Sequence, residues 1–585
     1  MKTPRPLWLL PLVLALAGCS TTAAVAGTAT TTTDTSATAE AAAVAADPSA
    51  SAAEVLAENQ EPHTTESTWD DADVIDVDLS DAAASGLTVD GDTVTITEAG
   101  TYRLTGELDG GVVVSSSGFV RLILDGATIS NTDGAAIDIA EADKAAIVLA
   151  DGSENALSDA SSYADDATAN AALYSATDLT ILGSGSLTVA GNGNDGIASS
   201  DGLVIAAGDI SVTAVDDGIR GKDYVWIAGG TVAVTAGGDG IKSDNAEEAE
   251  RGYVAIEGGD VTIDAGGDGV DAATDVVVFG GTLDVTTEAA SADASAKGIK
   301  GGAIVVVDGG DTNVASSDDA LHSNGVVHVA SGALELSSRD DAIHADSALS
   351  ISGGTVDITA SYEGLESMAI DISGGETTLV SSDDGVNASD GSGETMGGGG
   401  GGDSATAGVT FTMSGGTLVM DAGGDGLDSN GTATVTGGTI VVNGPTNDGN
   451  GALDVNGEFT VDGGVVLAAG SAGMAVAPST ASAQGFVAFS GSVAAGESVQ
   501  IVASDGTVLA SFTAEKAFAS LVYSSADIAN GSTYTLVSGG SAGETLAGTL
   551  STGGTAGSTT VATATAGEAP AGGMGGMGGG PGGGR

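Results

Sequence analysis

Cysteine, aromatic residues and basic residues are all scarce in this chain of 585 residues. The single cysteine, Cys19, excludes an internal disulfide, so packing or bound metal must stabilise the fold. Aromatic residues make up only 3%, too few for a wide core, whereas the 42% of hydrophobic residues suffice for a narrow one. The 14 basic residues face 80 acidic residues, and the formal charge of −66 argues against nucleic acid or an anionic membrane surface as a partner. We therefore expect cations to accompany this protein.

The first 19 residues have the pattern of a bacterial lipoprotein signal peptide. Lys2 and Arg5 precede an apolar run from Leu7 to Ala17, which is too short to span a bilayer. The sequence Leu-Ala-Gly-Cys then places Cys19 where a lipid would be attached; a chance cysteine after an ordinary secretory signal is the alternative. We predict a signal peptide over 1–19, a lipid on Cys19 that anchors the protein at the extracellular face of the cell membrane, and a flexible linker rich in Ala, Thr and Ser over 20–70.

An internal repeat of about 22 residues dominates the rest of the chain. In each period an acidic residue precedes a Gly or Ala and then an apolar residue. Inserted segments lengthen a few periods, and in one period a basic residue takes the place of the acidic one. The residues at this position are Asp195, Asp217, Asp239, Asp268, Lys297, Asp319, Asp341, Glu363, Asp384, Asp425 and Asp448.

Within one period the pattern is that of three short strands separated by Gly-marked corners, with no helical spacing. A leucine-rich repeat can share this period, but its Leu/Asn pattern is missing. We therefore predict an all-β fold, a three-sided parallel β-helix over residues 71–483, followed by a small β cap over 484–550 and a disordered Gly-rich tail over 551–585. Stacking of the coils predicts two inward columns. They are Val225, Val254, Val276, Val305, Val327, Leu349 and Ile370, and Ile219, Ile241, Val270, Ile299, Leu321, Ile343 and Leu365.

Several of the acids are doubled, at 216–217, 318–319, 340–341 and 383–384. Stacked carboxylates about 5 Å apart repel each other by about 1 kcal/mol or more, so a cation between them is expected. Calcium suits such all-oxygen ligands, whereas zinc or copper would need more histidine or cysteine. The alternative is that a single Asp at each corner only accepts hydrogen bonds from nearby backbone amides. His322 and His344 should be stacked neighbours, and we interpret their outward column as a solvated face.

The repeat resembles a known bacterial family. The run DDGIRGKDYVWIAGGTVAVTAGGDGIKSDN, followed by RGYVAIEGGDVTIDAGGDGV, DDALHSN, DDAIHAD, SYEGLES and GDGLDSNGTATVTGGTIVVNGPTNDGNGALD, is similar to the carbohydrate-binding domain-containing proteins with a pectate-lyase-like right-handed β-helix. The likeness covers roughly residues 75–550. It implies a right-handed coil, bound calcium, and binding of cellulose or of acidic sugars such as polygalacturonate.

The resemblance implies calcium at the acids of the repeat, and the doubling adds the neighbouring acid of each pair. Lys297 stands where an acid is expected, so we predict an interruption of the metal column there. The predicted calcium ligands are Asp216, Asp217, Asp239, Asp268, Asp318, Asp319, Asp340, Asp341, Glu363, Asp383 and Asp384.

One aromatic patch is predicted to form a platform for sugar rings. Tyr224 and Tyr253 should occupy one outward position on adjacent coils, with Trp226 beside them, although these aromatic side chains could instead pack against the inserted loop at 243–252. An acidic sugar would approach through bound calcium and nearby bases. The predicted basic residues of this site are Arg220, Lys222 and Lys242.

These features together predict a lipid-anchored, calcium-stabilised, monomeric protein that binds polysaccharide without catalysing its cleavage. A polysaccharide lyase or a glycosidase is the first alternative, because paired carboxylates about 5 Å apart have the spacing of retaining glycosidases. A ladder of similar carboxylates does not, however, supply the two distinct environments that catalysis needs. A surface spacer or adhesin with no sugar site is the second alternative.

Overall fold

The computed structural model describes residues 47–569, except for 64, 66–67, 86, 165–166, 290–294 and 392–404. The predicted signal peptide with Cys19, residues 20–46 of the predicted linker and residues 570–585 of the predicted tail lie outside the described residues. None of the helices in the described part of the chain is long and apolar enough to cross a bilayer.

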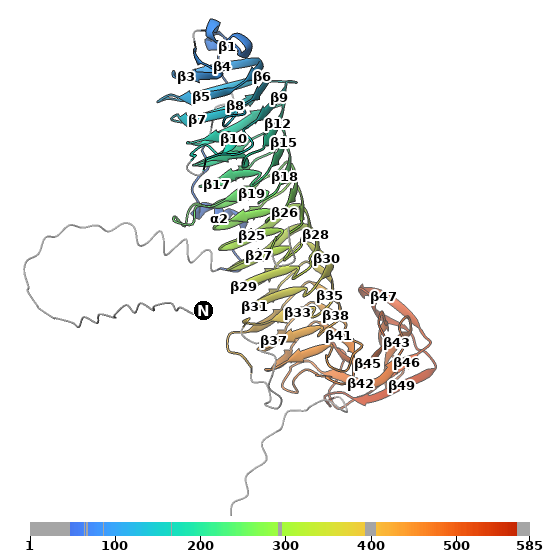
Figure 1. Cartoon of the computed structure of the whole chain (residues 1–585). Coiled ribbons are helices and arrows are strands. Elements are labelled where there is room, and N and C mark those ends of the chain that lie inside the picture. The colour runs from blue at the N-terminus through green and yellow to red at the C-terminus, as the bar shows by residue number, and fades with distance from the viewer. Residues whose placement is uncertain are drawn as a thin grey trace, which may run out of the picture.

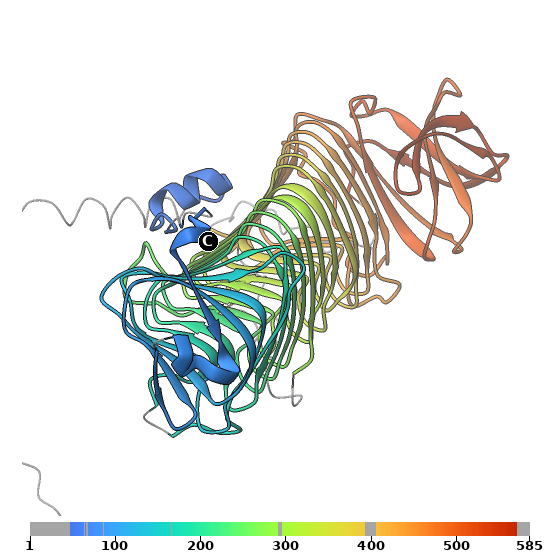
Figure 2. The ribbon, with the colours of Figure 1, turned by 90° about the horizontal axis from the view of Figure 1, so that it is seen from above.

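The body of the protein is a large, mostly parallel β-sheet that coils on itself. Strands pair in parallel with the equivalent strand one period further along the chain, as β14 (Gly202–Ile205) does with β17 (Tyr224–Ile227) and β17 with β20 (Tyr253–Ile256). Figure 1 shows the coils stacked from β1 (Val74–Asp78) to β41 (Val465–Gly470), and Figure 2, seen from above, shows successive coils lying one behind another. Each coil contributes strands to three faces. The all-β class and the three-strand period are thus confirmed.

Face 1 follows the acidic corner of each coil. Its strands are β3 (Thr93–Ile96), β5 (Gly111–Ser115), β7 (Ile137–Glu141), β10 (Ala171–Ser175), β13 (Asp195–Ser199), β16 (Ile219–Gly221), β19 (Ile241–Ser243), β22 (Val270–Ala272), β25 (Ile299–Gly301), β27 (Leu321–Ser323), β29 (Ile343–Ile351), β31 (Leu365–Ile372), β33 (Val386–Ala388), β36 (Leu427–Ser429) and β39 (Leu453–Val455).

Face 2 comes next along each coil, and β29 and β31 bend from face 1 onto it. Its other strands are β1 (Val74–Asp78), β4 (Gly100–Asp109), β6 (Val120–Ser130), β8 (Ala145–Leu149), β11 (Leu179–Gly183), β14, β17, β20, β23 (Asp275–Val278), β26 (Ile304–Ala315), β28 (Val326–Ser337), β34 (Thr410–Met413), β37 (Thr432–Val435) and β40 (Phe459–Val461).

Face 3 completes the coil, and the long strands β4, β6, β26 and β28 continue onto it from face 2. Its other strands are β9 (Glu154–Ser158), β12 (Ser186–Gly191), β15 (Asp209–Ala214), β18 (Thr231–Ala236), β21 (Asp260–Ala265), β24 (Thr282–Thr287), β30 (Thr355–Ser361), β32 (Glu376–Ser381), β35 (Thr417–Ala422), β38 (Thr439–Asn443) and β41 (Val465–Gly470).

The core consists of the inward columns that the repeat predicts. Val225 pairs with Val254 and, coil by coil, this register continues to Ile370. Ile219 begins the second column, which continues in register to Leu365. All of these side chains are buried in one continuous cluster, so both predicted columns are confirmed. One alignment was wrong further on: the residue that follows Asp425 in the acid column is Gly451, not Asp448, because the backbone N–H of Gly451 bonds to Asp425.

Residues 47–63, called here the N-terminal strap, pack against face 2 and correct the prediction of a flexible linker over 20–70. The strap contains α2 (Ala52–Glu58), which begins with a capping box between Ser51 and Glu54. Ala52 and Val55 are buried against the outward side chains of β23, β26 and β28. Figure 1 accordingly places α2 beside strands of the middle of the stack. Two short 3-10 segments, η1 (Asp71–Asp73) and η2 (Leu79–Ser85), and the hairpin strand β2 (Thr88–Asp90) then lead into the coil.

The C-terminal cap is larger than predicted. β45 (Phe518–Ser524) pairs antiparallel with β41, the last strand of face 3, and thereby covers a sheet edge that would otherwise stay open. Two strands lie wholly or almost wholly in the region predicted as a disordered tail from 551 onward, which corrects that boundary. The strands of the cap are β42 (Phe486–Val493), β43 (Ser498–Ala503), β44 (Val508–Thr513), β45 (Phe518–Ser524), β46 (Thr533–Ser538), β47 (Ser541–Ala547), β48 (Leu550–Thr555) and β49 (Thr559–Thr565).

Candidate functional site

The acids of the repeat form a ladder in which each carboxylate accepts a hydrogen bond from the next coil. The backbone N–H of Asp239 donates to Asp217 Oδ1 at 2.9 Å, and that of Asp268 donates to Asp239 Oδ1 at 2.8 Å. The same bond joins Lys297 N–H to Asp268 and Asp341 N–H to Asp319. These acids therefore have a structural role, because each satisfies a backbone donor at a corner where the chain changes direction.

The second oxygen of several ladder acids contacts a basic side chain. Lys242 Nζ lies 2.6 Å from Asp239 Oδ2 and 3.4 Å from Asp217 Oδ2, and Lys300 Nζ lies 3.1 Å from Asp268 Oδ2. Both bases stand on the outward column of face 1, where Asp271 lies between them. The few bases of the chain are thus concentrated where the carboxylates stack. Calcium does not fit well at Asp217, Asp239 and Asp268, because ammonium groups already occupy the oxygen atoms that it would need.

Further along the ladder, a polar cavity of about 400 Å³ opens on face 1. We call it the acid–histidine pocket, and its lining comes from the corners that precede β25, β27, β29 and β31 and from the outward side chains of the last three. The lining residues are Lys297, Asp318, Asp319, His322, Asp340, Asp341, His344, Tyr362, Glu363 and Glu366. Five predicted calcium ligands therefore meet in one pocket.

Asp319 is the most densely contacted carboxylate of the pocket. Its Oδ2 lies 2.7 Å from Lys297 Nζ and 2.8 Å from His322 Nδ1. Burial acts to raise the pKa of Asp319, but the hydrogen bond with His322 and the charge of Lys297 outweigh it and lower the pKa to about 2. Lys297 also lies 3.0 Å from Asp318 Oδ1, so the base that interrupts the acid column neutralises the next pair of acids.

The neighbouring acids of the pocket have the opposite shift. Burial and the charge of Asp341 raise the pKa of Glu363 to about 9, and burial together with Asp341 also raises the pKa of Glu366. Asp340 is exposed, but partial desolvation and the charges of Asp341 and Asp319 raise its pKa to about 6. Negative charge is therefore in excess here, and a further cation would be stabilised.

Three groups of side chains in this pocket could hold a metal ion, since their ligand atoms lie within 4.8 Å of one another. Two groups combine histidine with carboxylates, and the third contains oxygen ligands only. The groups are Asp319, His322 and His344; Asp341, His344 and Glu366; and Asp318, Asp319 and Asp340. The all-oxygen group has the donors that calcium prefers, but it surrounds Lys297.

The C-terminal part of the ladder suits calcium better. Among the described residues, no basic side chain forms an ion pair with Asp384, Asp425 or Asp428, and burial and neighbouring acids raise their pKa values to about 7, 6 and 8. Asn387 stands between Glu366 and Asp428 in the outward column, and its buried Oδ1 has no hydrogen-bond partner. An amide oxygen without a hydrogen-bond partner, beside carboxylates that form no ion pair with a basic side chain of the described chain, is a donor set that fits calcium.

The first acids of the doubled pairs lie beside the ladder. Asp216 and Asp340 are exposed, whereas Asp318 and Asp383 are half-buried. Of these, Asp318 contacts Lys297 and joins the pocket, as does Asp340. Doubling therefore predicted part of a real carboxylate cluster at 318–319 and 340–341, although at 216–217 the added acid, Asp216, only faces solvent.

The predicted aromatic platform is wrong, because the strap covers it. Tyr224 and Tyr253 stack with ring centroids 5.3 Å apart, as the repeat predicts, but both are fully buried. The Tyr253 hydroxyl donates to Gln60 C=O at 2.7 Å, and the Tyr224 hydroxyl accepts from His63 N–H at 2.8 Å. Trp226 is half-buried at the edge of this contact.

The predicted basic residues do not form one site. Arg220 pairs with Asp195 at 2.9 Å and with Asp244, and Lys242 belongs to the acid ladder. Lys222 is exposed. None of the three lines the acid–histidine pocket.

Sequence reasoning missed Tyr362, the aromatic residue of the acid–histidine pocket. Its side chain is 46% exposed. Among the large hydrophobic side chains that are exposed in the described part of the chain, it is the aromatic one. It lies one residue before Glu363 in the string SYEGLES. Its signal was its position next to the acid column, where the other coils have Gly, Ala, Asn or Asp.

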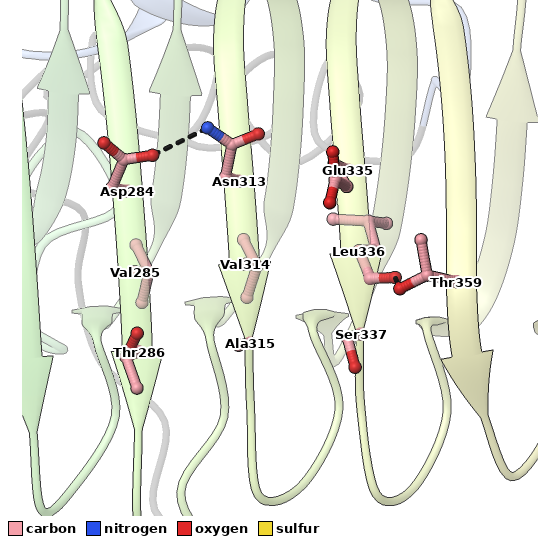
Figure 3. Close-up of a pocket in the computed structure, with 10 residues that line it drawn as sticks. All are labelled: Asp284, Val285, Thr286, Asn313, Val314, Ala315, Glu335, Leu336, Ser337 and Thr359. Carbon is pink, nitrogen blue, oxygen red and sulfur yellow. Dashed lines mark hydrogen bonds between the residues drawn. The ribbon is translucent and has the colours of Figure 1, made fainter.

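A second, shallower groove of about 200 Å³ lies on face 3. Figure 3 shows its short polar side chains on neighbouring strands, where Asn313 Nδ2 donates to Asp284 Oδ1 at 2.6 Å. Glu335 continues this row on the next coil. The groove contains no aromatic side chain, and the acid–histidine pocket is the richer site.

The fold and the site define an acidic, coiled all-β protein with a polar surface pocket beside an exposed tyrosine. The sequence profile described as carbohydrate-binding domain-containing protein matches residues 90–342. A solved polysaccharide lyase-like protein from C. thermocellum, determined as a gadolinium derivative, is 37% identical over 42% of this chain and 90% of that chain, with a TM-score of 0.33. Among curated proteins none matches. Over residues 90–342 the chain is therefore similar to the carbohydrate-binding domain-containing protein family.

Proposed function

We propose that this protein binds polysaccharide without cleaving it, and that the acid–histidine pocket is its sugar site. The observation that supports this proposal is the exposed Tyr362 ring beside a cluster of carboxylates. A sugar ring offers C–H groups on its face and hydroxyl donors around its edge. An aromatic side chain next to fixed hydrogen-bond acceptors complements both.

A neutral, cellulose-like chain is the preferred ligand of this proposal. The pocket is lined by six carboxylic acids but only one lysine and two histidines. Carboxylates accept hydrogen bonds from sugar hydroxyls, whereas a uronate polymer such as polygalacturonate would be repelled unless cations bridged the two surfaces. Binding of polygalacturonate should therefore depend on added calcium.

The absence of cleavage is proposed because the ladder acids already have structural partners. Asp319 and Asp341 accept backbone hydrogen bonds from the next coil. A glycosidase would need two carboxylates that are free to exchange protons with substrate. Release of reducing ends from cellulose, or of unsaturated products from polygalacturonate, would instead support the enzyme alternative.

The sugar site is tested by pull-down with insoluble cellulose and with polygalacturonate gel, each with and without a calcium chelator. An aromatic contact is worth up to about 1.5 kcal/mol, so Tyr362→Ala should weaken cellulose binding roughly tenfold, while Tyr362→Phe should bind almost normally. Trp226→Ala is the matched control and should bind like the wild type.

Equal retention of Tyr362→Ala and the wild type would remove the pocket as the sugar site. If neither polysaccharide retains the wild-type protein, the spacer or adhesin alternative is favoured.

We further propose calcium, a right-handed coil and a lipid anchor. Calcium fits the C-terminal ladder at Asp384, with Asp425, Asp428 and Asn387 as further oxygen donors. A right-handed coil is favoured because crossover connections between parallel strands are right-handed in nearly all sheets. The lipid on Cys19 would hold a monomer at the extracellular face of the membrane, and labelling with a radioactive fatty acid, abolished by Cys19→Ser, tests this.

A further inference from the structure

We propose that His322 and His344, together with Asp319, form a binding site for a divalent transition-metal ion, zinc in the first place, and that Asp341 and Glu366 lie within reach to complete it. This site differs from the all-oxygen calcium ladder in its donor chemistry. The proposal does not depend on sugar binding, since it rests on side-chain contacts of the protein alone.

The coil brings the two imidazole rings together. His322 on β27 pairs in register with His344 on β29, and the ring centroids are 5.0 Å apart. Each histidine follows a ladder acid by three residues, so Asp319 and Asp341 approach the rings from the same corner. Glu366 lies on β31, one coil further on, so three successive coils supply the five side chains.

The donor atoms have the spacing of a four-coordinate site. Ligands about 2.0–2.2 Å from a tetrahedral zinc ion are roughly 3.3–3.6 Å from one another. His344 Nδ1 lies 3.4 Å from Asp341 Oδ2, 3.4 Å from Glu366 Oε2 and 3.7 Å from Asp319 Oδ2. His322 Nδ1 lies 2.8 Å from the same Asp319 oxygen. A small adjustment of His322 would therefore suffice.

The outer ring nitrogens give an independent reason for the proposal. His322 Nε2 lies 3.0 Å from Asn324 Oδ1, and His344 Nε2 lies 3.5 Å from Asp346 Oδ1. Metal-bound histidines typically donate their other N–H to an oxygen in this way, which fixes the ring and leaves the inner nitrogen for the metal. In both histidines of this pocket the inner nitrogen is Nδ1, and it faces the carboxylates.

The donor chemistry selects the class of metal. Imidazole nitrogens with carboxylate oxygens suit zinc, copper or nickel, whereas calcium and magnesium prefer oxygen ligands only. Lys297 also contacts Asp319, but it has Asp318 Oδ1 at 3.0 Å as a second partner and can keep that contact when a metal binds. The His344 side chain is 27% exposed, so an ion can enter from solvent.

The test uses the full chain and zinc alone, with no polysaccharide present. Isothermal titration calorimetry should show one zinc ion bound per chain, and excess calcium or magnesium should not displace it. In ¹⁵N NMR spectra of the histidine side chains, zinc should shift the Nδ1 resonances of His322 and His344 and leave those of His63 and His328 in place. His328 is a matched control because it lies on face 2, away from the acid–histidine pocket, where its ring contacts Ala50 of the strap and Ser352.

Variants sharpen this result. His344→Gln should weaken zinc binding by at least about 100-fold, Asn324→Ala by about tenfold through the outer contact, and His328→Gln not at all. Zinc that binds the wild type and His344→Gln equally, or that shifts only Nε2 resonances, would overturn the proposal. Displacement of zinc by calcium would also overturn the proposal. If Tyr362→Ala does not affect cellulose binding, the proposed sugar site is wrong, but the proposed zinc site is unaffected.

Discussion

At the scale of single residues, the acid ladder assigns different roles to the two oxygens of one carboxylate. In Asp239, Oδ1 accepts the backbone N–H of Asp268, and Oδ2 contacts Lys242. The first contact satisfies a partly buried donor, and the second offsets repulsion between stacked acids. Both alternatives weighed from the sequence, a corner hydrogen bond and a cation between acids, are therefore realised in the same side chain.

This division of roles predicts an order of stabilities for variants of Asp239. Asp239→Ala leaves the N–H of Asp268 without its acceptor and should lower the free energy of unfolding by about 1–3 kcal/mol. Asp239→Asn keeps an oxygen acceptor and loses only the ion pair, so it should cost less. Denaturant unfolding of both variants and the wild type measures the difference, and Asp260→Ala on exposed face 3 is the control. Equal costs of Asp239→Ala and Asp239→Asn would contradict the role of the backbone bond.

At the scale of elements, the strap determines which part of face 2 is exposed to solvent. It covers Tyr224 and Tyr253 and also buries Asp275, whose Oδ2 accepts a hydrogen bond from Asn59 at 2.7 Å. Burial raises the pKa of Asp275 from 3.8 to about 6. We therefore expect docking of the strap to depend on pH.

The sign of this pH dependence follows from the direction of the shift. Because the folded state holds the proton more tightly, it binds more protons than the unfolded chain between pH 3.8 and about 6, and the contribution of Asp275 to stability falls as pH rises through this window. Asp275→Asn should remove this loss and stabilise the protein at pH 8 by up to roughly 3 kcal/mol.

Denaturant unfolding at several pH values from 4 to 8 measures the free energy of unfolding of Asp275→Asn and of the wild type. The two curves should lie close together at pH 4 and diverge toward pH 8. The exposed control Asp260→Asn should follow the wild type. A constant difference between Asp275→Asn and wild type at every pH would show that Asp275 is ionised at pH 4 as well.

At the scale of the whole molecule, the ladder changes character along the stack. From Asp195 to Asp341 the protein supplies its own cations, from Arg220 to His344. Beyond Glu363 the acids of the ladder continue, but in the described chain no basic side chain forms an ion pair with Asp384, Asp425 or Asp428. The C-terminal coils should therefore depend most on external cations.

Calcium should accordingly stabilise the whole fold through these coils. At a free concentration about 100 times the Kd, one bound ion raises the free energy of unfolding by about 2.7 kcal/mol, so the melting temperature in scanning calorimetry should rise on addition of calcium. The double variant Asp384→Asn and Asp428→Asn should lose this rise. The double variant Asp209→Asn and Asp260→Asn removes the same charge from face 3 and should keep it. If chelation leaves the melting temperature of the wild type unchanged, calcium has no structural role here.

The parts of the fold that could be predicted are those that depend on one coil lying in register on the next. The columns from Val225 and Ile219 are confirmed because a constant period turns equivalent positions into direct neighbours. The same logic placed His322 beside His344. It failed at Asp448, where an irregular turn shifts the rung to Gly451.

The site was only partly predictable, because exposure and partners depend on segments far away in the chain. The repeat placed Tyr224 and Tyr253 outward and stacked, but it could not show that residues near His63, 161 positions before Tyr224, would cover them. Nor could it show that Tyr362 would stay exposed. The sequence predicts an interruption of the acid column at Lys297, whereas in space Lys297 neutralises Asp318 and Asp319.

By itself, the sequence determined the coil, its three strands per period, the apolar columns and the column of acids, since these follow from a period that stacking converts into contact. Only the tertiary structure decided which outward surfaces remain open and which carboxylates have a cation. Those outcomes depend on where the strap, the cap and a few long basic side chains come to lie, and such contacts between distant segments have no period in the sequence.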